Sequence, residues 1–173
     1  DFKQSIITSF VMLMVFFAAS LLAVDVIITE RREGIWNRTL VAGVAFTELL
    51  ASHIIINGIF LIIQLIQTFA FLFHIYDNRG SYVIASLLIG LVGFCGLLYG
   101  LWIGCFAMIF MLAHCVLDGV ALVMIFLSGV IWPVEGIAII LRYFAFLTPL
   151  TYPAISLKNI VMKGYSITHP TVF

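Results

Sequence analysis

The chain has 173 residues, 64% of them hydrophobic and only 9% charged, and its eight basic and eight acidic residues give a formal net charge of zero. A soluble domain has roughly a quarter of its residues charged, so this composition excludes an ordinary soluble protein and indicates a membrane protein. The zero net charge gives no basic surface for nucleic acid. The three cysteines lie ten residues apart and match neither a disulfide framework nor a zinc site.

Four apolar runs predict membrane-spanning helices at residues 6–28, 53–75, 82–108 and 116–132. A bilayer core about 30 Å thick needs roughly 20 helical residues, and each run provides enough. No charged residue occurs from position 81 to position 117. One straight helix of that length would reach about 55 Å, so the run has to break. Its polar sequence AHCVLDG, residues 113–119, predicts the turn.

After Pro133 the pattern changes, because charged residues and prolines interrupt the apolar sequence. Such sequence suits a re-entrant or interfacial segment better than a span, and we expect one over residues 134–173. There is no internal repeat or flexible linker. The fold class is therefore predicted to be all-α, a polytopic membrane helix bundle that forms one domain over residues 1–173.

The stretch TERREGIWNRTLVAG, residues 29–43, contains five of the sixteen charged residues. Placing these five in the bilayer would cost on the order of 15 kcal/mol, so the stretch must lie in water or among headgroups. Trp36, Leu40 and Val44 recur every four residues, which predicts a short amphipathic helix over about 29–44, with Trp36 in the membrane interface. The alternative is a plain loop that only fixes the orientation.

The orientation has evidence on both sides. Three basic residues within the short segment 29–44 favour the cytosol, but counting over the whole chain puts five basic residues on the opposite side. The sequence Asn37-Arg38-Thr39 is an N-glycosylation acceptor that is usable only in a lumen. A cytosolic segment predicts that Asn37 carries no sugar.

Polar and small residues within the spans allow structural and functional interpretations. Asp25 is expected to pair with Arg31 or Arg32, with a buried ion site as the alternative. His114 and Asp118, one helical turn apart, are either polar caps at a turn or a proton relay. Five glycines share one face of the third span, which predicts close helix packing, with pore lining as the alternative; they are Gly90, Gly93, Gly96, Gly100 and Gly104. No metal-ligand pattern and no phosphate-binding glycine loop occurs in the sequence, so we expect no enzyme in this chain.

Two motifs resemble those of a known family. Glu30-Arg31-Arg32-Glu33-Gly34, directly after a span, resembles the E-R-x-x-G segment of type 2 ABC exporter permeases. About a hundred residues later, SGVIWPVE (128–135) resembles the family's S-G-x-x-x-P-x-E, and Pro149-Leu150-Thr151 matches its recurrent P-L-T. The resemblance covers about residues 9–166 and is closest to the half-transporters of subfamilies G and H.

The resemblance implies roles for particular residues. It places the coupling helix, which docks on a nucleotide-binding domain, on Glu30, Arg31, Glu33 and Gly34, with Arg38 and Leu40 completing the surface. It places the re-entrant segment on Ser128, Gly129, Pro133, Glu135 and Pro149. The family's permease has six helices, so this chain would be a fragment that carries the second to the fifth.

The resemblance also implies partners. ATP and Mg²⁺ would be bound by a nucleotide-binding domain, with no cofactor in this chain, and a second permease half would complete a homodimer or heterodimer in the plasma membrane. The cargo would be a lipid or another hydrophobic molecule. We expect it against Asn57, Gln64 and Gln67, for which interhelical hydrogen bonding is the alternative. A passive channel lined by the glycine face, or a membrane enzyme that uses His114 and Asp118, are the alternative functions.

Overall fold

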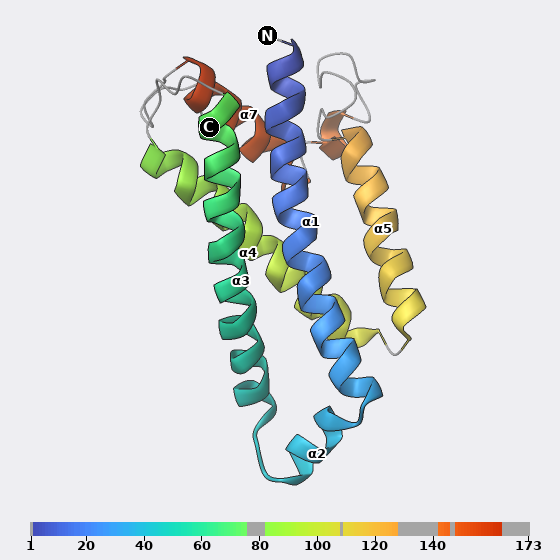
Figure 1. Cartoon of the computed structure of the whole chain (residues 1–173). Coiled ribbons are helices and arrows are strands. Elements are labelled where there is room, and N and C mark those ends of the chain that lie inside the picture. The colour runs from blue at the N-terminus through green and yellow to red at the C-terminus, as the bar shows by residue number, and fades with distance from the viewer. Residues whose placement is uncertain (1, 76–81, 108, 128–141, 146–147, 164–173) are drawn as a thin grey trace.

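The computed structural model describes residues 2–75, 82–107, 109–127, 142–145 and 148–163, and within these ranges all regular structure is helical (Figure 1). The helices are α1 (Phe2–Arg32), α2 (Ile35–Val41), α3 (Phe46–Ile75), α4 (Tyr82–Phe106), α5 (Phe110–Leu127) and α7 (Thr151–Lys163). Of these, α1, α3, α4 and α5 are long and apolar enough to cross a membrane. The predicted all-α, polytopic fold is confirmed.

Helix α1 is the centre of the bundle and packs against α3, α4, α5 and α7. In the apolar window of α1, 61% of the residues are buried, against 22% in α3 and 17% in α5. The outer helices therefore leave most of their apolar side chains exposed, as expected of surfaces that contact lipid chains. Figure 1 shows α2 and the α4–α5 turn at one end of the bundle and α7 at the other.

Helices α1 and α4 approach closely through the glycine face of α4. A Cβ atom at Gly96 or Gly100 would overlap the backbone carbonyl oxygen of Phe16 or Ser20. The Ser20 hydroxyl donates to the Gly96 carbonyl across this seam, at 2.8 Å. Small residues allow such contact between helix backbones in lipid. The predicted close packing is confirmed, and α1 occupies the face that a pore would have used.

The turn predicted at residues 113–119 is wrong. Helix α4 ends at Phe106 and α5 starts at Phe110, so the sequence AHCVLDG lies inside α5. The 25 residues of α4 already reach about 37 Å, enough to cross the bilayer, so the chain can turn there without a polar signal. The predicted end of this span near residue 132 lies outside the described residues.

The helices on either side of residues 29–44 extend beyond the apolar runs. Helix α1 continues to Arg32, four residues past the predicted end of the first span at residue 28. Helix α3 starts at Phe46, seven residues before the predicted start of the second span at residue 53. The start of α3 has a local cause, because the Glu48 carboxylate accepts a hydrogen bond from the backbone N–H of Ala45 at 3.0 Å, as in a capping box.

Part of the predicted re-entrant segment 134–173 is described. Helix α7 packs against α1 and α4, and its 13 residues reach only about 20 Å, too short to cross the bilayer. Pro149 lies exposed two residues before this helix. The other predicted members of the segment, Ser128, Gly129, Pro133 and Glu135, lie outside the described residues.

Candidate functional site

Residues 29–44, which we call the elbow, form two helical pieces instead of the single predicted helix. Helix α1 runs through Arg32, and Gly34 then adopts φ +71°, a left-handed conformation that glycine reaches without strain. Helix α2 follows from Ile35 to Val41, and Gly43, at φ +95°, lies in the short connection to α3. Glycine conformation thus sets both bends of the elbow.

The inner face of the elbow is built around Trp36, which is only 5% exposed. Its ring stacks on His53 of α3, with centroids 5.9 Å apart and an interplanar angle of 11°, and meets Phe46 edge-on at 5.9 Å. The Arg31 guanidinium lies 5.0 Å from the centroid of the indole ring, in cation–π geometry. The prediction of Trp36 in the membrane interface is therefore wrong, because the ring finds its apolar and cationic partners within the protein.

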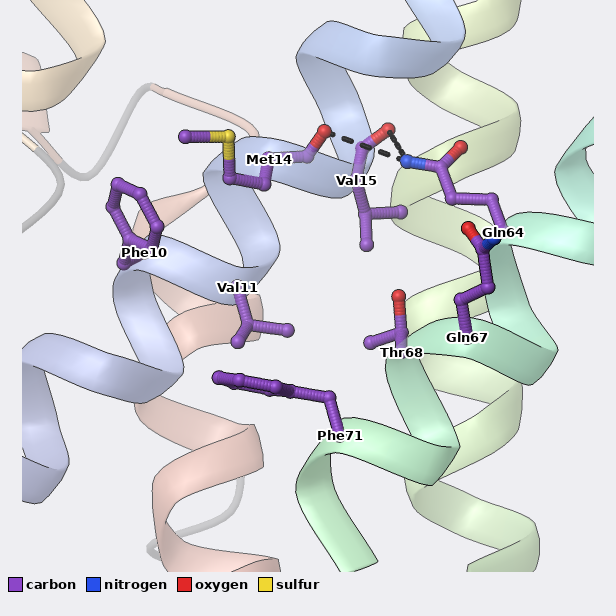
Figure 2. A pocket seen from close by; sticks show the side chains of 8 residues that line it. All are labelled: Phe10, Val11, Met14, Val15, Gln64, Gln67, Thr68 and Phe71. Carbon is purple, nitrogen blue, oxygen red and sulfur yellow. Dashed lines mark hydrogen bonds between the residues drawn. The ribbon is translucent and has the colours of Figure 1, made fainter. Parts of the chain in front are cut away.

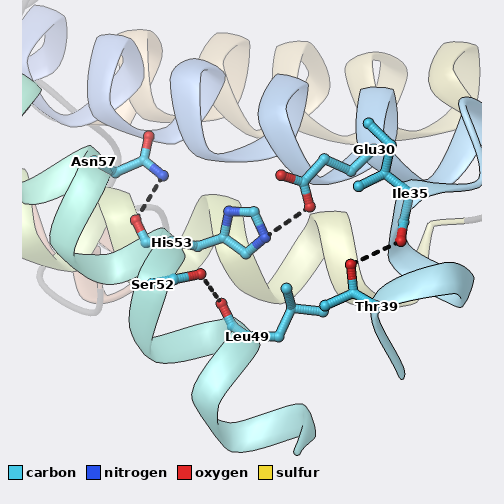
Figure 3. A network of polar contacts seen from close by, with 7 residues as sticks. All are labelled: Glu30, Ile35, Thr39, Leu49, Ser52, His53 and Asn57. Carbon is cyan, nitrogen blue, oxygen red and sulfur yellow. Dashed lines mark hydrogen bonds and ion pairs between the residues drawn. The ribbon is translucent and has the colours of Figure 1, made fainter. Parts of the chain in front are cut away.

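Glu30 joins the same cluster (Figure 3). Its Oε2 lies 3.1 Å from Nε2 of His53, a side chain that is 1% exposed. The Asn57 side chain, one turn further along α3, donates to the backbone carbonyl of His53 at 2.9 Å. Asn57 is buried here and is not among the residues that line the apolar groove described below. Sequence reasoning assigned no role to His53, although it is a polar residue at the start of an apolar run.

The outer face of the elbow carries exposed charged and apolar side chains together. Glu33 and Arg38 are exposed, and Val41 is 89% exposed. A hollow of about 300 Å³, lined by Thr29, Arg32 and Glu33, lies beside them. The residues predicted for coupling therefore separate: Glu30 and Arg31 hold the inner face, Gly34 makes the bend, and Glu33 and Arg38 lie on the outer surface. Leu40 is 36% exposed and lies one turn from Trp36, on the same side of α2.

A groove of about 240 Å³ lies between α1 and α3 (Figure 2). The Gln64 side-chain amide donates to the backbone carbonyls of Met14 and Val15, at 3.4 and 3.2 Å, so Gln64 bonds between helices as the alternative interpretation proposed. Gln67 is exposed in the groove. The complete lining is Phe10, Val11, Met14, Val15, Gln64, Gln67, Thr68 and Phe71. The four lining residues that come from α1 were not predicted, because the sequence alone does not distinguish an apolar helix face that lines a groove from one that contacts lipid.

Asp25 and His114 form a second carboxylate–imidazole contact, between α1 and α5, with Oδ1 and Nε2 3.1 Å apart. His114 Nδ1 lies 3.0 Å from the backbone carbonyl of Phe110. The expected pairing of Asp25 with Arg31 or Arg32 is therefore wrong, because α5 brings an imidazole to Asp25 while Arg31 lies over Trp36. Within the described ranges, no group of three or more histidine, cysteine, aspartate or glutamate side chains could hold a metal ion.

In the described part of the chain, three membrane helices pack around a fourth, the central α1. With a charged elbow at one end and an apolar groove between α1 and α3, they define a helical membrane domain of the kind found in transporters. Comparison with protein families agrees, since the family model described as ABC-2 type transporter matches residues 2–162, and the chain belongs to that family. It is thus an integral, multi-pass membrane permease, a transport component and not itself a catalyst. Neither the curated proteins nor the solved structures gave a match.

Proposed function

We propose that this chain is the membrane part of an ATP-driven exporter, and that the elbow is the coupling element that a nucleotide-binding domain pushes. The observation that carries the proposal is the two-faced elbow. Its inner face is held by Trp36 and Glu30, while its outer face presents Arg38 and Val41 at the end of the bundle. A mixture of a cation and apolar side chains on one exposed surface suits docking to a protein.

The elbow is connected to both walls of the groove. Two residues link α2 to α1, and four residues link it to α3. A seven-residue helix is too short to be stable alone, so the packing of Trp36 is what keeps α2 in place. Because α1 and α3 form the groove, a displacement of α2 would tilt both of its walls, as in other domain closures driven by a nucleotide.

The groove suits a hydrophobic cargo. Phe10, Val11 and Phe71 offer apolar surface, and Gln67 and Thr68 add hydrogen-bonding groups to the same lining. A polar group at membrane depth costs free energy unless it is paired, so a cargo with its own hydrogen-bonding group fits better than a plain hydrocarbon. We propose a lipid or lipid-like molecule, exported from the plasma membrane by this permease together with a second half and the ATP-binding partner.

The test is ATP-dependent transport of a fluorescent phospholipid by the full-length transporter in proteoliposomes, comparing Arg38→Glu with Lys158→Glu. Both changes reverse one positive charge, but Lys158 lies in α7 at the opposite end of the bundle. Arg38→Glu should lower the rate about tenfold, as expected from a loss of about 1.4 kcal/mol at a docking surface, and Lys158→Glu should change it little. Equal rates in the two variants would contradict the proposal, and flux that needs no ATP would favour the passive channel.

A further inference from the structure

His53 is the one described side chain of α3 that contacts charged and aromatic partners on both sides of the bend at Gly34. Its Nε2 lies 3.1 Å from the carboxylate of Glu30 in α1, and its ring stacks on Trp36 in α2. The backbone carbonyl of His53 also accepts a hydrogen bond from the Asn57 side-chain amide. Figure 3 shows the imidazole between α1 and α3, pointing at Glu30. Three helices therefore meet at a single buried ring.

Stability alone does not account for a histidine at this position. Burial of polar groups is unfavourable unless every one is paired. Nδ1 and Nε2 of His53, Oε2 of Glu30 and Oδ1 of Asn57 are all buried without a hydrogen-bond partner in the described part of the chain. Nε2 and Oε2 face each other at 3.1 Å as an ion-pair contact. Apolar residues of similar volume often replace a buried ion pair with no loss of stability. A buried imidazole–carboxylate contact, however, is lost when the two groups move apart by a few ångströms, whereas apolar packing allows sliding. The polar pair is therefore better suited to fixing position than to adding stability.

The elbow needs such a fixed point, because each of its two bends contains a glycine at positive φ. Gly34 precedes α2 and Gly43 follows it, and no atom lies within 4 Å of a Cβ built at Gly43. Two such bends would let a seven-residue helix swivel when it is pushed. The contacts of Trp36 and Glu30 with His53 oppose that swivelling, since they tie α2 and the end of α1 to the first turns of α3.

We propose that His53 is a positioning residue that locks the elbow to α3, so that a push on α2 moves α3 together with α1. This inference rests on the proposed coupling function of the elbow. Without the lock, a push on α2 would be absorbed at the two glycine bends, and ATP would be hydrolysed with less transport.

Local mobility provides a test that does not depend on ATP. A nitroxide label is attached at Asn37→Cys, an exposed position on α2. The protein used is the full-length transporter with all its native cysteines replaced by alanine, Cys95, Cys105 and Cys115 among them. His53→Phe keeps a ring to stack on Trp36 but removes the contact with Glu30, and it should mobilise the label. His53→Gln keeps a hydrogen-bond donor and should leave the label immobile. His114→Phe is the matched control, since it breaks the other carboxylate–imidazole contact of α1 but touches nothing in α2.

The second readout is the number of lipid molecules transported per ATP hydrolysed. In His53→Phe this ratio should fall by roughly 2- to 30-fold, the range that corresponds to coupling changes of residues between two linked sites, while His53→Gln should retain it. A purely structural role would lower the yield of folded protein and leave the ratio unchanged. An immobile label in His53→Phe, or a mobile label with an unchanged ratio, would overturn the proposal. Failure of the Arg38→Glu test would instead remove the coupling function and leave the mobility result standing.

Discussion

Replacing Gly96 by alanine adds only one methyl group, but it should clearly destabilise the bundle. A Cβ at this position would lie 3.0 Å from both the carbonyl carbon and the Cα of Phe16, atoms of a helix backbone that cannot rotate away. Carbon atoms in optimal contact are about 3.5–4.0 Å apart, so α1 and α4 must separate by about 0.5–1 Å.

The separation has two energetic consequences. Overpacking of this kind typically costs about 1–3 kcal/mol. The Ser20 hydroxyl lies 2.8 Å from the carbonyl oxygens of both Gly96 and Phe16. Lengthening the bond to Gly96 therefore removes at most about 0.6 kcal/mol, the average for such bonds in a membrane protein. Alanine regains up to about 1 kcal/mol through its higher helix propensity. The net expectation is a loss of about 1–3 kcal/mol in the free energy of unfolding.

The assay is reversible unfolding in mixed micelles, titrated with sodium dodecyl sulfate and followed by circular dichroism, with Gly90→Ala as the control. Gly90 lies on the same glycine face of α4, but its nearest neighbour would be a leucine methyl of α3 at 3.7 Å, an ordinary contact. Gly90→Ala should therefore be neutral or stabilising by up to about 1 kcal/mol. If the two variants unfold alike, the close approach of α1 and α4 at Gly96 is refuted.

Three further predictions address the elbow and the groove. Gly34→Ala should cost about 1–2 kcal/mol, because φ +71° is unfavourable for an L side chain; the same unfolding titration measures it, with Gly58→Ala, where nothing lies within 4 Å of the added Cβ, expected to show no loss. Gln67→Leu should raise the KM for lipid transport about fivefold, the effect of one lost hydrogen bond of about 1 kcal/mol, and an unchanged KM would remove Gln67 from the cargo site. Asn37 should carry no sugar, so endoglycosidase treatment should leave the electrophoretic mobility unchanged, and a shift would place the elbow in a lumen.

The four spans and the helical class could be predicted because long uncharged runs have few alternatives to membrane helices. The error at residues 113–119 shows the limit of that reasoning. His114 and Asp118 suggested an exposed turn, but His114 can remain inside α5 because Asp25 of α1 lies 3.1 Å away. One sequence shows the polarity of a residue and not the partner that satisfies it.

The elbow could be predicted as a charged, non-spanning segment, but its inner face could not. The four-residue spacing of Trp36, Leu40 and Val44 shows that one side prefers an apolar environment, and lipid and protein both provide one. The contact between Glu30 and His53 joins residues 23 positions apart on different helices, so neither periodicity nor spacing could indicate it. Gln64 was predicted to contact the cargo, with hydrogen bonding between helices as the alternative. It lies beside the groove on α3, and its amide donates to the backbone of α1.

The most direct test of the account is to find what the outer face of α2 touches. A photo-crosslinking amino acid is placed at Val41, which is 89% exposed, in the full-length transporter in native membranes. The same residue at Lys158 is the control, and the crosslinked peptides are identified by mass spectrometry. We predict that position 41 captures peptides of a nucleotide-binding domain, in the same chain or a separate one, and that position 158 does not. Capture of lipid alone at position 41, or the same partners at both positions, would contradict the coupling role of the elbow.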